Sequence, residues 1–231
     1  MAAPVLNPTA RTNVVRQGRE QQPVIVIDDM LCDLDWWRAT AEQLSYSRIG
    51  PHYPGLRAPV PPAQSNAMRD ELETLVRETF ALDPVPPVLE CYFSIVTTPP
   101  EALAPIQRLP HVDGLEPDRI AILIYLSGAE MGGTAFYRQR ATGFETLDPD
   151  RYPQFEATLR AGIAEHGLPS PAYISGDTPL YEKIASYDGR PNRGLIYRSR
   201  SLHCAEIPAG LPLPASPRDG RLTINSFLFG A

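Results

Sequence analysis

The chain has 231 residues, of which 43% are hydrophobic and 21% charged, and its formal net charge at pH 7 is −6. This length and composition predict a globular domain with a core of its own, and the negative charge argues against nucleic acid and membrane surfaces as partners. Three widely spaced cysteines indicate a reducing compartment without disulfides. Because we find neither an apolar signal segment nor an apolar run of about 18 residues, we expect a cytoplasmic protein.

The first part of the chain predicts an arm, two helices and a long loop. Residues 1–22 are polar with scattered Pro and Arg, so we expect a loose N-terminal arm, followed by a single domain over residues 23–231. Apolar residues at helical spacing predict helices over residues 36–44 and 65–82. Five prolines within residues 50–64 predict an irregular loop between the two helices.

Short runs of β-branched and aromatic residues, separated by Gly and Pro, predict strands in the rest of the chain. These runs cover residues 23–27, 88–97, 119–127, 134–138, 193–198 and 220–229. Residues 148–190 are expected to form an insertion with a helix near residues 152–166. The spacing of the strands predicts a mainly β, α+β fold, namely a jelly-roll or cupin-like barrel with the N-terminal helices packed on one face.

The spacing of two residues near the middle of the chain predicts a metal site. On an extended strand, side chains two residues apart point to the same face, so His111 and Asp113 can reach one metal ion. His203 is the candidate for a third ligand. Two His and one carboxylate leave coordination positions open, which suits non-haem Fe(II) that binds a co-substrate and O2 together. The alternative readings are a turn pair after Pro110 and, for His203, a buried strand histidine.

This pair is the first of four features that follow one another along the chain. They are the His111-x-Asp113 pair, a strand ending at residues 124–127, the run Gly132-Gly133-Thr134-x-Phe136, and His203 followed by Arg221. Their order resembles that of the 2-oxoglutarate- and Fe(II)-dependent oxygenases, particularly the prolyl-hydroxylase-like branch. The resemblance is at the level of motifs and covers residues 91–229 apart from the insertion over residues 148–190. It implies a double-stranded β-helix in which the two histidines and the aspartate hold iron inside one end.

The resemblance also implies a binding site for the co-substrate. Arg221 corresponds to the basic residue that holds the distal carboxylate of 2-oxoglutarate, and a guanidinium pairs well with a carboxylate. Thr223 lies two residues further along, on the same face, and its hydroxyl could donate to that carboxylate. Tyr125 and Tyr92 correspond to tyrosines of the co-substrate pocket, although aromatic residues on strands often only pack.

The segment between His203 and Arg221 is longer than is usual in the family, so three other arginines remain alternative anchors. These are Arg198, Arg200 and Arg218. The implied activity is that of a dioxygenase that uses Fe(II), 2-oxoglutarate and O2 to hydroxylate a small-molecule, amino-acid or peptide substrate, with release of succinate and CO2. The alternatives are a cupin-type metalloprotein without 2-oxoglutarate, and a barrel that binds a small molecule or a partner but has lost catalysis. The sequence does not define the oligomeric state.

Overall fold

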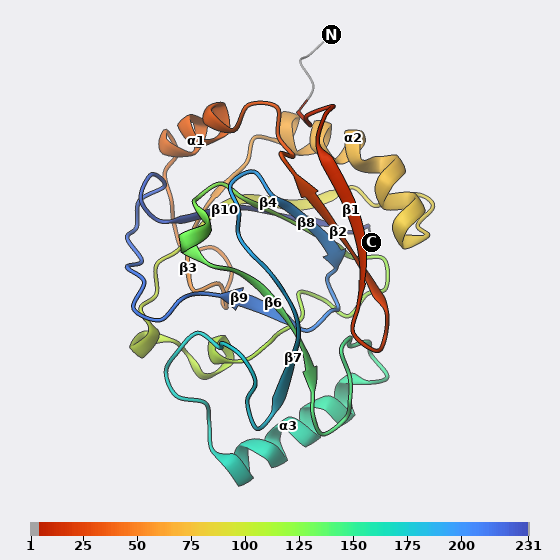
Figure 1. Cartoon of the computed structure of the whole chain (residues 1–231), viewed down its shortest axis with the longest axis vertical. Coiled ribbons are helices and arrows are strands. Elements are labelled where there is room, and N and C mark those ends of the chain that lie inside the picture. Colours follow the sequence, from red (N-terminus) through yellow and green to blue (C-terminus); the bar gives the residue numbers. More distant parts are fainter. Residues whose placement is uncertain (1–4, 231) are drawn as a thin grey trace.

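Ten strands form two antiparallel sheets in the computed structural model, which describes residues 5–230 (Figure 1). The larger sheet has the strand order β1-β2-β8-β5-β10-β4-β3, and the smaller has the order β7-β6-β9. The strands are β1 (Arg11–Gln17), β2 (Gln22–Asp28), β3 (Gly55–Pro59), β4 (Val88–Val96), β5 (Ile120–Tyr125), β6 (Gly133–Gln139), β7 (Tyr181–Tyr187), β8 (Gly194–Arg198), β9 (His203–Glu206) and β10 (Arg221–Leu228). The α helices of the described part are α1 (Leu34–Glu42), α2 (Pro62–Phe80) and α3 (Tyr152–His166).

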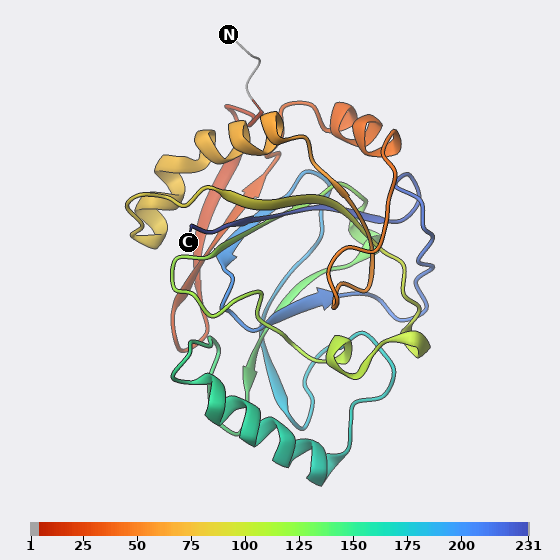
Figure 2. The same cartoon turned by 180° about the vertical axis from the view of Figure 1, so that it is seen from behind.

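The helices occupy opposite ends of the molecule, with α1 and α2 together at one end and α3 at the other (Figures 1 and 2). Met68, Leu72 and Val76 form the buried stripe of α2 and share one core with Ile122 and Ile124 of β5. The predicted α+β class and the packing of the N-terminal helices on one face of the sheet are confirmed, and both helices begin slightly earlier than expected. Within the described residues, no helix is long and apolar enough to cross a membrane.

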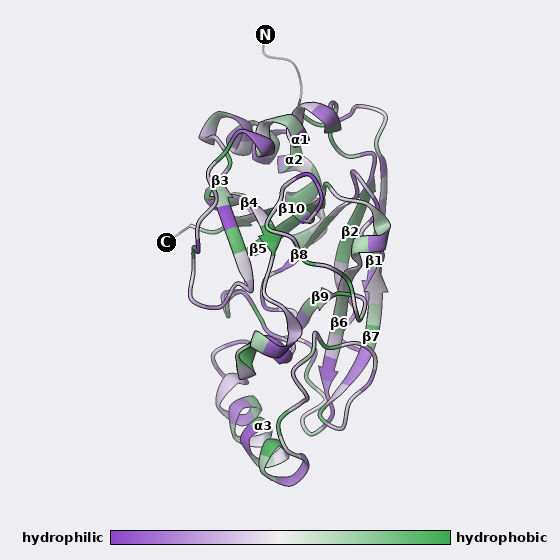
Figure 3. Cartoon of the chain, turned by 90° about the vertical axis from the view of Figure 1, so that its left-hand side faces the viewer, coloured by the Kyte–Doolittle hydropathy of each residue, from purple (hydrophilic) through white to green (hydrophobic). Residues whose placement is uncertain are grey.

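Figure 3 shows β5 as largely hydrophobic, and the face of the large sheet away from α1 and α2 holds apolar residues such as Leu123 as well as polar ones. Ile124 and Ile224 lie in the core under the helices, so their neighbours Tyr125 and Thr223 point the other way, as the alternation of a strand requires. The strand register aligns four residues of this second face in one row across β5, β10, β4 and β3. They are Tyr125, Thr223, Ser94 and Arg57.

The small sheet packs against α3 through a second core. Phe155 of α3 lies in one cluster with Tyr137 of β6 and Tyr181 of β7. The helix predicted near residues 152–166 is confirmed. The segment expected to be an insertion, residues 148–190, also contains β7, which pairs with β6 and forms an edge of the small sheet; the insertion itself stays a prediction.

Two N-terminal predictions need correction. The loose arm expected over residues 1–22 contains β1, which pairs along its whole length with β2. Residues 1–4 of the expected arm lie outside the described part. The loop expected over residues 50–64 contains β3, which pairs with β4, and its last residues begin α2. Both strands lie at the edges of the large sheet, where one side chain in two can face water and prolines are tolerated. Whether the two sheets close into a barrel stays a prediction.

Candidate metal centre

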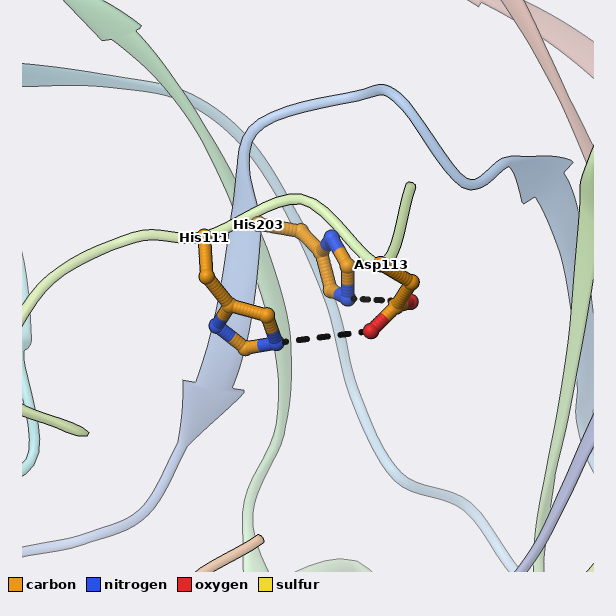
Figure 4. A group of neighbouring side chains, drawn as sticks. All are labelled: His111, Asp113 and His203. Carbon is orange, nitrogen blue, oxygen red and sulfur yellow. Dashed lines mark ion pairs between the residues drawn. The ribbon is translucent and has the colours of Figure 1, made fainter. Parts of the chain in front are cut away.

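The backbone brings the three residues of the predicted metal site together. His203 is the first residue of β9, and His111 forms an isolated bridge to it: each amide donates to the other's carbonyl at 2.9 Å. The amide of Asp113 donates to the carbonyl of Ser199 at 2.8 Å, which fixes the third residue beside the other two. Figure 4 shows both imidazole rings turned toward the Asp113 carboxylate. The His-x-Asp spacing and the distant histidine therefore converge as the sequence predicts.

The donor atoms are spaced for a single ion. One nitrogen or oxygen atom from each residue lies within 4.8 Å of the others. The Nε2 of His111 lies 3.7 Å from one oxygen of Asp113, and the Nε2 of His203 lies 3.3 Å from the other. The Nδ1 of His203 lies 2.9 Å from the carbonyl of Ser201; as the donor in this hydrogen bond, it leaves Nε2 free to bind a metal. Two imidazoles and one carboxylate form the donor set of non-haem Fe(II) sites.

The two histidines differ in their affinity for protons. Burial and the neighbouring His203 lower the pKa of His111 to about 4, so this imidazole is neutral at neutral pH. Burial opposes the charged form of His203, but the charge of Asp113 and its hydrogen bond outweigh this and raise the pKa of His203. Burial likewise opposes the charge of Asp113, and His203 again outweighs it, so the pKa of Asp113 is lowered. The carboxylate is therefore ionised and ready to bind a cation.

The candidate ligands lie in the wall of a cavity of about 410 Å³. Both sheets contribute to this wall, through residues such as Thr223 of β10 and Thr134 of β6, and residues 50–54 before β3 form another part of it. A volume of this size is typical of pockets for small organic ligands, about 300–1,000 Å³. The cavity thus has room for small organic ligands beside the three candidate metal ligands.

Arg221 lines this cavity and is 4% exposed. Its Nη2 donates to the carbonyl of Gly133 at 2.9 Å, and its guanidinium lies 5.7 Å from the ring centre of Tyr125. Among residues 5–230, no carboxylate forms an ion pair with it, and its Nε has no hydrogen-bond partner. A buried charge without a partner is costly, so this site is suited to an anionic ligand.

The other residues predicted to bind the co-substrate are placed differently. Thr223 lines the cavity, and its hydroxyl lies 2.8 Å from the side-chain oxygen of Asn225. Tyr125 does not line the cavity; its hydroxyl lies 2.6 Å from that of Thr134. Tyr92 is also outside the cavity wall and lies under the guanidinium of Arg57, which is 5.4 Å from its ring centre. The structure thus brings two of the four residues to the cavity.

None of the three alternative anchors lines the cavity. Arg218 forms an exposed ion pair with Glu42 at 2.7 Å, on the outer surface. Arg198 donates to the carbonyls of Phe80 and Pro117. Arg200 is likewise absent from the cavity wall, whereas Arg221 is part of it.

The cavity wall also holds residues that the sequence patterns do not single out, among them Tyr53 and Arg57. The hydroxyl of Tyr53 is buried without a hydrogen-bond partner, and Arg57 stacks on the Tyr53 ring at 4.1 Å. Both residues fall in the segment that its prolines predicted to be an irregular loop. A signal was present, because Arg57 stands between Leu56 and Ala58 and this alternation is that of a strand.

With this geometry, the chain can be compared with known proteins. A family model matches residues 8–228, so the chain belongs to that family, which is described as a family of unknown function, DUF6445. No curated protein matches the chain.

Three solved structures are similar to the chain. The chain is similar to SnoN, a non-heme alpha ketoglutarate dependent epimerase from nogalamycin biosynthesis, with a TM-score of 0.52, 14% identity and coverage of 92% of this chain and 79% of that one. A prolyl-4-hydroxylase from Pseudomonas putida matches with a TM-score of 0.49 and 15% identity, covering 92% of this chain and 95% of that one. HygX from Streptomyces hygroscopicus, bound to nickel, 2-oxoglutarate and hygromycin B, matches with a TM-score of 0.48 and 17% identity, covering 91% and 87%. At these identities, the similarity to SnoN shows a shared fold.

Proposed function

We propose that this chain is a non-haem Fe(II)- and 2-oxoglutarate-dependent dioxygenase. The observation that carries the proposal is the pairing, in one cavity, of the His111, Asp113 and His203 cluster with a buried arginine, Arg221, that has no carboxylate partner. A metal site alone would not need this cation. The similarity of the fold to that of an alpha ketoglutarate dependent epimerase supports the same reading.

In the proposed reaction, O2 oxidises 2-oxoglutarate and the substrate together, giving succinate, CO2 and a hydroxylated product. His111, Asp113 and His203 would hold Fe(II), which supplies the site for O2 activation. Arg221 would hold the distal carboxylate of 2-oxoglutarate through its guanidinium, while its bond to Gly133 keeps the side chain in place. The walls from both sheets would hold the co-substrate and the substrate beside these three residues.

The test needs no substrate. Anaerobic protein is loaded with Fe(II) and titrated with 2-oxoglutarate, while the visible charge-transfer band of the chelate is recorded. We expect a band in the wild type, no band in His111→Ala, and a band in Arg221→Gln only at concentrations of 2-oxoglutarate about tenfold higher or more, because a charged hydrogen-bonding partner is lost. Arg218→Gln is the matched control, since it removes the same charge on the outer surface and should leave the titration unchanged.

The other readings predict different results. Tight binding of Fe(II) without any band would contradict the use of 2-oxoglutarate and favour a cupin-type metalloprotein. A protein that binds no metal would be a barrel that binds a small molecule or a partner without catalysis. An unchanged titration in Arg221→Gln, with a weaker one in Arg218→Gln, would move the anchor to the other arginine.

A further inference from the structure

A second arginine in the cavity also lacks a carboxylate partner. We infer that Arg57 forms a second anion-binding subsite, and that the substrate of the proposed oxygenase is a small molecule with a carboxylate group that Arg57 binds. This inference rests on the proposed function, because it names the substrate class of that site. The subsite itself is a property of the cavity and can be tested separately.

Arg57 comes from a different strand than Arg221, the proposed anchor of the co-substrate. Arg57 pairs with Ser94 on β4, and Ser94 pairs with Thr223 on β10, so two strand spacings separate Arg57 from β10. Neighbouring strands lie about 4.8 Å apart, which places the two backbones roughly 10 Å apart. Arg221 lies on β10, two residues before Thr223. The two guanidinium groups of the cavity thus come from different strands of the large sheet, β3 and β10, with β4 between them.

Aromatic rings hold the guanidinium of Arg57 but leave its charge uncompensated. Its central carbon lies 4.1 Å from the ring centre of Tyr53 and 5.4 Å from that of Tyr92. Rings contact the flat faces of a guanidinium and leave the N–H groups at its edge free to donate. The Nε of Arg57 is buried without a hydrogen-bond partner, and within the described part of the chain no carboxylate forms an ion pair with it. A planar carboxylate would satisfy two of these donors at once.

Arg57 and Arg221 differ from the other charged residues of the cavity wall in how they are paired. Arg119 also lines the cavity, but it has a partner in Glu116 at 3.7 Å. The acidic residues of the wall are Glu90 and Asp113, and neither lies within ion-pair distance of Arg57. In the proposed site Asp113 would bind the metal, so it is not available to Arg57. The positive charge of Arg57 therefore has no acidic partner in the cavity wall, and an acidic substrate would offset it.

The experiment compares acids with neutral molecules of the same shape. The probes are benzoate, phenylacetate and phenyl phosphate, each paired with a neutral analogue (benzamide, phenylacetamide and phenyl acetate). Binding is measured by saturation-transfer NMR and calorimetry, on metal-free protein and on anaerobic protein loaded with Fe(II) and 2-oxoglutarate. We expect at least one carboxylate to bind at least about tenfold more tightly than its amide, because a charged pair replaces a neutral contact. Phenyl phosphate shows whether the subsite accepts phosphate as well.

The variants assign this preference to Arg57. Arg57→Gln should reduce binding of the acid to the level of the amide, and Arg57→Lys should restore part of the preference, because a lysine keeps the charge but loses the planar pair of donors. Arg48→Gln is the matched control: Arg48 is exposed, lies in the same part of the chain and does not line the cavity. It should leave both affinities unchanged. Arg57→Gln should also leave the charge-transfer titration with 2-oxoglutarate unchanged.

The possible results separate the subsite from the proposed function. The subsite is refuted if every acid binds no better than its neutral analogue, or if the preference survives in Arg57→Gln. If the preference depends on Arg57 but no charge-transfer band forms, the subsite stands and the dioxygenase proposal falls. If the band forms while the preference is absent, the dioxygenase proposal stands without an acidic substrate.

Discussion

At the scale of single residues, the raised pKa of His203 has a consequence for metal binding. Ligands of a metal must be deprotonated, so a proton on His203 competes with the ion, whereas His111, whose pKa is lowered, is neutral at neutral pH. Because the pKa of His203 lies above its usual value of about 6.5, the competition extends to higher pH than for an ordinary histidine. We expect the affinity for Co(II), followed by its visible absorption, to rise with pH from about 6, by up to about tenfold per unit. An affinity that stays constant from about pH 6 to 8 would contradict this.

The residues of the site differ in how well the sequence predicts them. His111 and Asp113 stand two positions apart, so a spacing rule finds them without knowledge of the fold. His203 and Arg221 were found through their order along the chain. Arg57 follows no such rule, because its place in the cavity depends on the pairing of β3 with β4, which joins segments far apart in the sequence. Local patterns thus predict site residues that lie close together on one strand. They do not predict residues that reach the cavity only because two strands distant in the sequence pair.

At the scale of elements, one buried carboxylate joins the first hairpin to the small sheet. Glu145 is 3% exposed and accepts hydrogen bonds from the backbone amides of Arg19 and Glu20, in the turn between β1 and β2, at 2.8 and 3.0 Å. It also accepts a bond from the Nε of Arg138, on β6, at 2.8 Å. We expect Glu145→Ala to lower the free energy of unfolding by about 3 kcal/mol, since it leaves two amides without a partner and removes the buried one of the two carboxylates that pair with Arg138. Urea denaturation followed by circular dichroism would measure this.

Glu182 provides the control for this prediction. It pairs with the same arginine, Arg138, at 2.7 Å, but its side chain is 37% exposed. Glu182→Ala should therefore cost about 1 kcal/mol or less, because water replaces the lost partner. Equal losses in the two variants would show that burial of Glu145 does not set its contribution.

At the scale of the whole molecule, the strands that the sequence predicts are those inside the sheets. The strands β2, β8, β5, β10, β4 and β6 have neighbours on both sides, and all of them were predicted from apolar, β-branched runs. The strands β1, β3, β7 and β9 are edges, and all four were missed. An edge strand needs fewer apolar residues and tolerates Pro and charge, so its local pattern resembles that of a loop. An edge strand is held in place by the strand with which it pairs, as β3 is by β4. For that reason, the local sequence of β3 does not reveal that Arg57 lines the cavity.

Acid stability is also set by contacts between distant parts of the molecule. Two hydrogen bonds from Arg193 hold the pKa of Asp28 below its usual value, and they join the end of β2 to the start of β8. A lowered pKa means that the contribution to stability is complete above the usual pKa of about 4 and is lost as the pH falls through the lower, folded-state value. We expect Asp28→Asn to cost about 1–2 kcal/mol at neutral pH and to make the loss of stability in acid shallower.

Asp29, the residue after Asp28, provides a control for this prediction. Asp29 also pairs with an arginine, Arg11, at 3.1 Å, but both side chains are more than half exposed. Asp29→Asn makes the same chemical change one position away, and an exposed pair contributes little, so we expect nearly wild-type stability at every pH. Unfolding free energies of the three proteins, measured by urea denaturation from about pH 3 to 7, would separate the effects. If Asp28→Asn and the wild type lose stability in parallel as the pH falls, the Asp28–Arg193 pair does not contribute to acid sensitivity, and the loss must come from other carboxylates with lowered pKa values, such as Glu206 beside Lys183.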